Sequence, residues 1–379
     1  MSHPLDAPKL ERVRALMDEQ GLDALVVRAP DNVVYLTNFW GMKGYDACVF
    51  PREGEPVLIC LEASAEDAAR TAWTRDVRYV RGYDEKDPRP PLARTLDAAV
   101  EAAKRYGSVG LELSLGTQAS DRMVGEPTTF TRAWFDAFPD AADATPLLGR
   151  ARAIKTEQEI ARIRVANEIA AAAMEHVREK LEVGMKESEA AAIWQGYVHG
   201  RGTARDDVEL ALPFSLVWAG KGIKTFTATS DLPVTEGEPV LFEIWVCADG
   251  YWADHTKNLV VGELTPEYAE LEARLMRVYE AALDHIRPGA SMAELDVLVR
   301  EGLQFEPSHP ICHGVGARAH EPPYPHQAAG GAFEERMVLA VEPGIYWEGG
   351  GGLRVEDNFL VTSGGLEKLS AFPDGVVRC

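Results

Sequence analysis

The C-terminal half of the chain contains five side chains whose types and positions would suit a site for divalent metal ions. Four are carboxylates and one is an imidazole: Glu243, Asp254, His313, Glu342 and Glu356. Such ligands favour hard or borderline ions like Mn, Co, Fe or Zn over a thiolate type of zinc site. Bound ions of this kind lower the pKa of water and polarise carbonyl groups, so a metal-dependent hydrolase is the leading hypothesis.

The first two acids lie in the segment LFEIWVCADGYWADHTKNLVV, which has the pattern of a β-hairpin. Residues with high β propensity flank Asp249 and Gly250, a dipeptide that closes two-residue turns because both positions tolerate positive φ. This turn pairs Trp245 with Asp254, so Glu243 and Asp254 lie on the same face of the hairpin. Two carboxylates that are close together on a buried face repel each other unless a cation lies between them.

The other two acids are expected on a second pair of strands. The segments MVLAVEPGIY and GGLRVEDNFLVT flank a glycine run and place Glu342 and Glu356 on strands, with Arg354 on the same face as Glu356. A glycine-containing loop between the strand pairs, HPICHGVGARAHEPP, presents three histidines: His309, His313 and His320. Most single acids are solvated, but solvation does not easily explain strand acids that are flanked by large apolar residues.

These motifs carry a resemblance to a known family. Over residues 152–362, from RAIKTEQEIARIRVAN through ADGYWADHTKN, HGVGARAHEPP and AVEPGIY to LRVEDNFLVT, the chain resembles the pita-bread superfamily. This superfamily includes creatinase, Xaa-Pro dipeptidase (prolidase), aminopeptidase P and methionine aminopeptidase, and the long N-terminal part is similar to the prolidase and aminopeptidase P branch. The resemblance implies that the five residues named above bind two divalent ions, with Mn expected and Co, Zn or Fe as alternatives.

The resemblance also implies roles in cleaving the bond before proline in short peptides with a metal-activated hydroxide. Glu342 would bind metal and shuttle a proton, while His320 would stabilise charge on the tetrahedral oxygen. His309 and Arg354 would contact the C-terminal side of the substrate. Alternatively, each histidine only bonds a backbone carbonyl, and Arg354 compensates the charge of the nearby acids.

Two residues depart from the family pattern. Glu243 stands where the family has Asp, and its extra methylene would shift or weaken the second metal. Phe226 stands where the peptidases usually have a substrate-contacting His, so it either changes the substrate pocket or is a core residue. These two residues leave open a creatinase-like or ectoine-hydrolase-like enzyme that cleaves a non-peptide C–N bond. A non-catalytic module that binds a peptide or protein partner is a second alternative, although the loss of several ligands that would mark it is not seen, since at least four of the five persist.

Composition narrows the classes of partner. A net charge of -21 argues against nucleic-acid binding, which relies on clusters of Lys and Arg. Five cysteines without a CxxC pair indicate reduced thiols in a cytoplasmic protein. The first residues lack a long apolar stretch, so we expect neither a signal peptide nor a membrane span. The family resemblance implies a homodimer.

The predicted architecture has two domains. Helices and strands interleave over roughly the first 140 residues, with NVVYLT, ACVF, PVLIC, VRYV and VGLEL as strands. We therefore expect an N-terminal creatinase/prolidase-like α/β domain at 1–145, a linker around 139–146, and a C-terminal α+β pita-bread domain with a curved antiparallel sheet at 150–379. In the second domain, Thr156 with Glu159 and Ser291 with Glu294 predict the N-termini of two helices.

Overall fold

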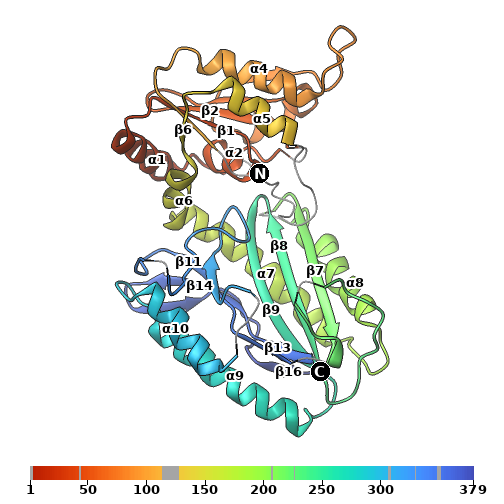
Figure 1. Ribbon diagram of the computed structural model, residues 1–379. Helices are drawn as coiled ribbons and strands as arrows, with labels where there is room; N and C mark the ends of the chain where they lie inside the picture. The colour runs from red at the N-terminus through yellow and green to blue at the C-terminus, as the bar shows by residue number, and fades with distance from the viewer. Residues whose placement is uncertain are drawn as a thin grey trace. The chain divides into compact units, whose positions relative to one another are not determined.

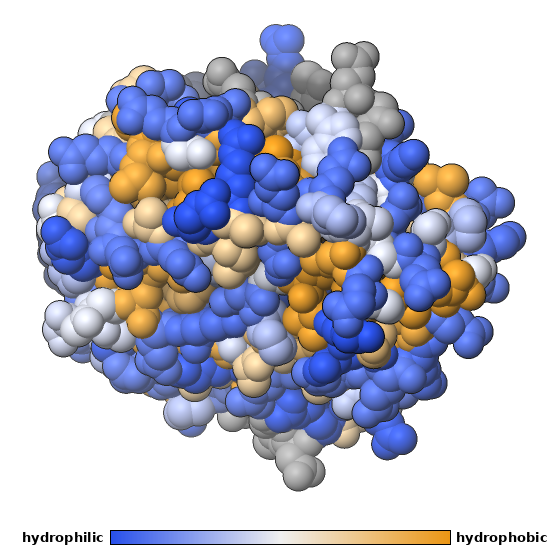
Figure 2. All heavy atoms as spheres, turned by 90° about the horizontal axis from the view of Figure 1, so that it is seen from below, coloured by the Kyte–Doolittle hydropathy of each residue, from blue (hydrophilic) through white to orange (hydrophobic). Residues whose placement is uncertain are grey.

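The chain divides into two compact units, Met1–Arg152 and Ala153–Cys379 (Figure 1). The computed structural model describes residues 3–41, 44–112, 128–205, 208–225, 227–305, 309–328, 330–347 and 351–379. Phe226, a candidate substrate contact, lies outside these residues. On the face that Figure 2 draws, hydrophilic residues are widespread and apolar residues form separate patches. Among the helices that the structure describes, none combines the length and the apolar composition needed to cross a bilayer.

The N-terminal unit is built on a mixed six-stranded sheet with the order β4-β3-β2-β1-β5-β6. Its strands are β1 Ala24–Val27, β2 Ala47–Pro51, β3 Val57–Leu61, β4 Asp76–Val80, β5 Val109–Leu111 and β6 Ala142–Asp143. Its helices are α1 Ala7–Gln20, α2 Pro30–Thr37, α3 Ala65–Thr71, α4 Pro91–Ala103, α5 Thr128–Ala137 and α6 Thr145–Ala153. Strands β1 to β3 are buried along their whole length, because separate apolar clusters cover the two faces of the sheet. The predicted α/β class is confirmed.

One predicted strand of this unit is wrong. The segment NVVYLT belongs to helix α2, which has Pro30 and Asp31 in its first turn and ends at Asn38 in the left-handed conformation. All residues of α2 are buried, so the segment has no polar face whose period would distinguish a helix from a strand. The predicted linker around 139–146 contains β6 and the first residues of α6.

In the C-terminal unit, the described residues form two four-stranded sheets and one two-stranded ribbon. The first sheet has the order β16-β9-β8-β7, the second has the order β10-β11-β14-β15, and β12 pairs with β13. The strands are β7 Ala211–Ala219, β8 Pro239–Ala248, β9 Tyr251–Val260, β10 Cys312–Gly314, β11 Val338–Val341, β12 Gly344–Trp347, β13 Gly351–Arg354, β14 Asp357–Thr362, β15 Gly365–Lys368 and β16 Val376–Arg378. All pairings are antiparallel except that of β16 with β9.

Four long helices pack against these sheets (Figure 1). They are α7 Glu157–Arg178, α8 Glu187–Tyr197, α9 Pro266–His285 and α10 Met292–Leu303. Helices α7 and α8 share an apolar core with the first sheet, and α9 and α10 share one with the second. Thr156 and Glu159 form the predicted capping box of α7, and Ser291 accepts from the backbone N–H of Glu294 at the start of α10.

The predicted hairpin is confirmed as β8 and β9. Asp249 and Gly250 form its turn with φ values of 47° and 89°, which the pair of residues was expected to adopt. Trp245 lies opposite Asp254, as predicted, and Glu243 lies opposite Thr256. Because side chains alternate along a strand, the first sheet presents these four residues on one face.

Candidate metal centre

Three carboxylates converge on one imidazole nitrogen in the C-terminal unit. His313 Nε2 lies 3.3 Å from Glu342 Oε1, 3.7 Å from Asp254 Oδ2 and 3.9 Å from Glu356 Oε1. All four side chains are buried. The structure thus brings together four of the five ligands that the sequence suggested.

Breaks between strands position two of these acids. Glu342 follows β11 and Glu356 precedes β14, so the prediction that both lie within strands is wrong. The Glu342 N–H donates to Ile311 O, next to the pairing of β10 with β11, whereas the Glu356 N–H donates to Thr256 O in β9 of the other sheet. This single bridge to β9 brings Glu356 to the sheet that carries Asp254.

The candidate ligands form two overlapping groups among the described residues. Asp254, His313 and His320 make one group, and His313, Glu342 and Glu356 make the other. Within each group, the atoms that could bind a metal lie within 4.8 Å of one another. His320 Nε2 approaches Asp254 Oδ2 at 3.2 Å, and its side chain keeps 28% exposure.

The charges of the cluster fit a divalent cation. Burial, together with the charges of Glu342 and Glu243, raises the pKa of Asp254 to about 7. Burial and the charges of Asp254 and Glu342 also raise the pKa of Glu356 well above its usual value. Burial alone would lower the pKa of His313, but the adjacent carboxylates outweigh it and raise this pKa to about 9. Without a cation the cluster therefore has to retain protons, which a metal ion would displace.

The hydrogen bonds of the cluster also fit a bound metal ion. Asp254 Oδ2 and His313 Nε2 are buried without a well-aligned hydrogen bond. His313 Nδ1 lies 3.0 Å from Gly314 O. With the proton on Nδ1, this contact is a hydrogen bond and leaves the lone pair of Nε2 directed toward the acids, as in histidines that bind metals.

Close backbone packing holds the loop that presents His313. The N–H of Gly314 donates to Glu321 O and Pro323 O. A Cβ at Gly314 would lie 2.4 Å from Pro322 O, so only glycine fits. Glu321 also forms a buried ion pair of 2.9 Å with Lys155, which the sequence analysis did not identify as part of the site.

Glu243 lies outside both ligand groups. Its Oε2 forms a buried ion pair of 2.8 Å with Arg354 Nη2. Arg354 Nε donates to Thr256 Oγ1 at 2.6 Å, and this hydroxyl donates to Glu356 Oε2 at 2.7 Å. Arg354 is buried, and its Nε lies 4.0 Å from Glu356 Oε2, so it shares a face with that acid as predicted. Thr256 was missed, although the hairpin register places it opposite Glu243.

His309 contacts Oε2 of Glu342, the oxygen that does not face His313. Its Nδ1 lies 3.2 Å from Glu342 Oε2 and 2.7 Å from Pro310 O, and its Nε2 lies 3.0 Å from the hydroxyl of Tyr346. Burial alone would raise the pKa of Glu342, but His309 and His313 outweigh it and lower this pKa. Tyr346 was not singled out from the sequence, although it follows Glu342 closely in AVEPGIY.

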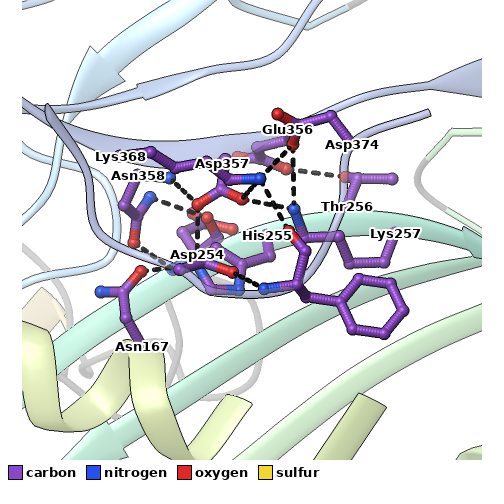
Figure 3. A network of polar contacts seen from close by, with 12 residues as sticks. Asn167, Asp254, His255, Thr256, Lys257, Glu356, Asp357, Asn358, Lys368 and Asp374 are labelled. Carbon is purple, nitrogen blue, oxygen red and sulfur yellow. Dashed lines mark hydrogen bonds and ion pairs between the residues drawn. The ribbon is translucent and has the colours of Figure 1, made fainter. Parts of the chain in front are cut away.

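A second polar network connects β9 with β14 next to the candidate ligands (Figure 3). The side-chain amide of Asn358 accepts from the N–H of Asp254 at 3.0 Å and donates to its carbonyl at 2.8 Å. On the opposite face of β9, Lys257 forms a buried ion pair with Asp357, and His255 lies 3.5 Å from the same carboxylate. Asp254 and Glu356 therefore each have a neighbour in the chain that is fixed in a buried polar network.

Comparison with known proteins adds independent observations. Residues 161–363 match the family model for metallopeptidase family M24, and residues 9–165 match that for the creatinase/prolidase N-terminal domain. An Xaa-Pro dipeptidase from Lactobacillus delbrueckii subsp. lactis is 27% identical over 378 residues, covering 95% of this chain and 96% of the relative. One from Pyrococcus horikoshii is 25% identical over 370 residues, covering 96% of each. The structure of an Xaa-Pro dipeptidase from Bacillus anthracis has a TM-score of 0.80 at 23% identity, covers 98% of this chain and 99% of that chain, and shows a shared fold.

Proposed function

Because the chain belongs to metallopeptidase family M24, we propose that it is an Xaa-Pro dipeptidase or aminopeptidase, which cleaves the bond before proline in short peptides. Membership confirms the resemblance to the prolidase and aminopeptidase P branch and the predicted pita-bread fold. The observation that carries the proposal is the convergence of Asp254, Glu342 and Glu356 on His313 Nε2.

We propose that Asp254, His313, Glu342 and Glu356 hold the metal, with Mn as the first ion to test. A divalent ion supplies a lowered pKa for water and a polarised substrate carbonyl. A site that binds the carbonyl suits proline peptides, because an Xaa-Pro bond has no N–H for a protease to hold. The choice of Mn, the homodimer and the cytoplasmic location stay predictions.

Three side chains have proposed roles in moving charge. Glu342 is the proton carrier, and its Oε2 lies 3.2 Å from His309 Nδ1. His309 fixes that oxygen by the same contact. His320, the partly exposed histidine, stabilises negative charge on the substrate oxygen.

For Arg354 we propose charge compensation in place of substrate binding. Its guanidinium is buried and lies against Glu243, Thr256 and Glu356. A group with these three partners is not available to a substrate carboxylate. This assignment selects one of the two alternatives that the sequence left open.

The test is proline release from Xaa-Pro dipeptides with added Mn, with Xaa-Ala dipeptides as the comparison. We expect turnover with the proline peptides, and a loss of at least about 100-fold in Glu342→Gln, because the proton carrier is removed. His199→Asn, a change at an exposed histidine, is the matched control and should retain activity. Absence of turnover with Mn, Co, Zn and Fe would refute the proposal.

A creatinase-like or ectoine-hydrolase-like cleavage of a non-peptide C–N bond is the second candidate. It is favoured by Glu243, which pairs with Arg354 and stays outside the ligand groups. Exhaustive chelation separates the two candidates: activity that survives it favours the second, and strict dependence on metal favours the peptidase.

A further inference from the structure

The Glu243 carboxylate forms an ion pair with the guanidinium of Arg354. Its Oε2 lies 2.8 Å from Arg354 Nη2, and both side chains are buried. In this position Glu243 does not join any group of three candidate ligands among the described residues. One of the five acidic or imidazole side chains is therefore neutralised without a metal ion.

The two oxygens of Glu342, and likewise those of Glu356, face different sides of the cluster. Glu356 directs Oε1 toward His313 Nε2, while its Oε2 accepts the hydrogen bond from Thr256. Glu342 directs Oε1 toward His313 and Oε2 toward His309. Each acid thus offers one oxygen to the His313 side, and protein donors occupy the other oxygen.

Arg354 and Thr256 connect the carboxylates of Glu243 and Glu356. Arg354 Nε donates to Thr256 Oγ1, which in turn donates to Glu356 Oε2, so one chain of contacts links Glu243, Arg354, Thr256 and Glu356. A dication bound between Glu243 and Glu356 would have to break this series of contacts. It would also lie beside a buried guanidinium, and two cations in a site of low dielectric repel strongly.

The balance of charge agrees with one ion. Glu243, Asp254, Glu342 and Glu356 carry four negative charges when ionised, and Arg354 carries one positive charge. One dication reduces the excess negative charge to a single unit. A second dication would give the buried cluster a net charge of about +1, which the positive charge of Arg354 makes unfavourable.

We infer that the centre holds one divalent ion per chain, on the His313 side, and that the Arg354 guanidinium takes the place of a second ion. The inference rests on the peptidase function proposed above and replaces the two ions that the family resemblance implied. Glu243 is, on this basis, a positioning residue for Arg354 and not a metal ligand.

The test counts ions directly. Mn²⁺ titration by calorimetry, and elemental analysis after removal of loosely held metal, should give one equivalent in the wild type. Glu243→Gln, which keeps the side-chain length, should also bind one equivalent, whereas Glu342→Gln should bind none or bind at least about 10-fold more weakly. Glu236→Gln, at an exposed acid, controls for non-specific binding. The electron paramagnetic resonance spectrum of the Mn²⁺ form should show an isolated ion.

Each result decides between specific alternatives. Two equivalents in the wild type, or a spectrum of two coupled ions, would overturn this inference and leave the proposed function intact. One equivalent in the wild type and none in a folded Glu243→Gln variant would also overturn it, because Glu243 would then bind the single ion. No specific binding in the wild type would overturn both proposals. The wild-type count alone is decisive if the variant does not fold.

Discussion

The buried ion cluster behind the candidate metal centre makes a quantitative prediction about stability (Figure 3). Lys257 Nζ lies 2.5 Å from Asp357 Oδ2 and 3.4 Å from Asp374 Oδ1. Lys368 Nζ lies 3.2 Å from Asp357 Oδ2 and 2.8 Å from Asp374 Oδ1. Lys257 and Asp357 are almost fully buried, with side-chain exposures of 1% and 0%. The substitution Lys257→Met removes the ammonium group and keeps most of the side-chain length.

The expected cost follows from the partners that remain. Removing one partner of a buried ion pair costs about 3–5 kcal/mol, since it leaves a charge uncompensated in a medium of low dielectric. Lys368 still faces Asp357 in the Lys257→Met variant, so we expect a loss near the lower limit, about 3 kcal/mol. Asp357→Asn removes the partner of both lysines and should cost more. In the double variant the two losses should not add, with a coupling of about 2 kcal/mol.

The assay is denaturant unfolding at pH 7 of the wild type, both single variants and the double variant. Arg164→Met is the matched control, because Arg164 pairs with Glu367 at 2.7 Å on the surface of the same unit. Exposed pairs contribute at most about 1 kcal/mol. A Lys257→Met variant that is no less stable than this control would refute the reasoning. A coupling below about 0.5 kcal/mol would show that Asp357 does not depend on Lys257.

Three further predictions concern the same network and the His313 loop. Burial lowers the pKa of His255 from 6.5 to about 3, so between these values only the unfolded chain binds the proton, and stability falls as the pH falls. The free energy of unfolding should drop by about 2 kcal/mol between pH 7 and pH 5. Denaturant titrations should show a smaller drop in the His255→Gln variant. An equal drop would show that His255 is not the group responsible. Asn358→Ala leaves the N–H and carbonyl of Asp254 without partners and should cost about 2–4 kcal/mol. Calorimetry should also show weaker Mn²⁺ binding in this variant, and unchanged affinity would exclude a positioning role. Gly314→Ala should lower the melting temperature, because the new Cβ would lie 2.4 Å from a main-chain oxygen, whereas Gly330→Ala enters open space; equal midpoints would count against this packing argument.

Local sequence patterns predicted those elements whose signals are short in range. The turn at Asp249 and Gly250 fixed the register of β8 with β9, because a two-residue turn leaves one pairing for every later residue. The capping residues Thr156 and Ser291 marked helix starts for a similar reason. Helix α2 was assigned as a strand because all of its residues, polar ones included, are buried, and burial on all sides hides the helical period.

The candidate site was predictable in its residue types and only partly in its geometry. The sequence indicated that Asp254, His313 and two glutamates belong together, and the structure brings an oxygen of each of the three acids within 3.9 Å of His313 Nε2. It could not show that Glu342 and Glu356 lie at breaks between strands, nor that Glu356 bridges to Thr256 in the other sheet, because that contact joins residues far apart in the chain.

By itself, then, the sequence determined the hairpin register and the family and indicated the types of the candidate ligands, since each depends on short motifs that can be read directly from the chain. Only the tertiary structure shows which charged group lies against Glu243. Its hairpin would allow it to face the same cation as Asp254, but its partner Arg354 comes from a distant strand. Which charge neutralises a buried acid depends on the groups that packing brings within a few ångströms, and no local pattern specifies them.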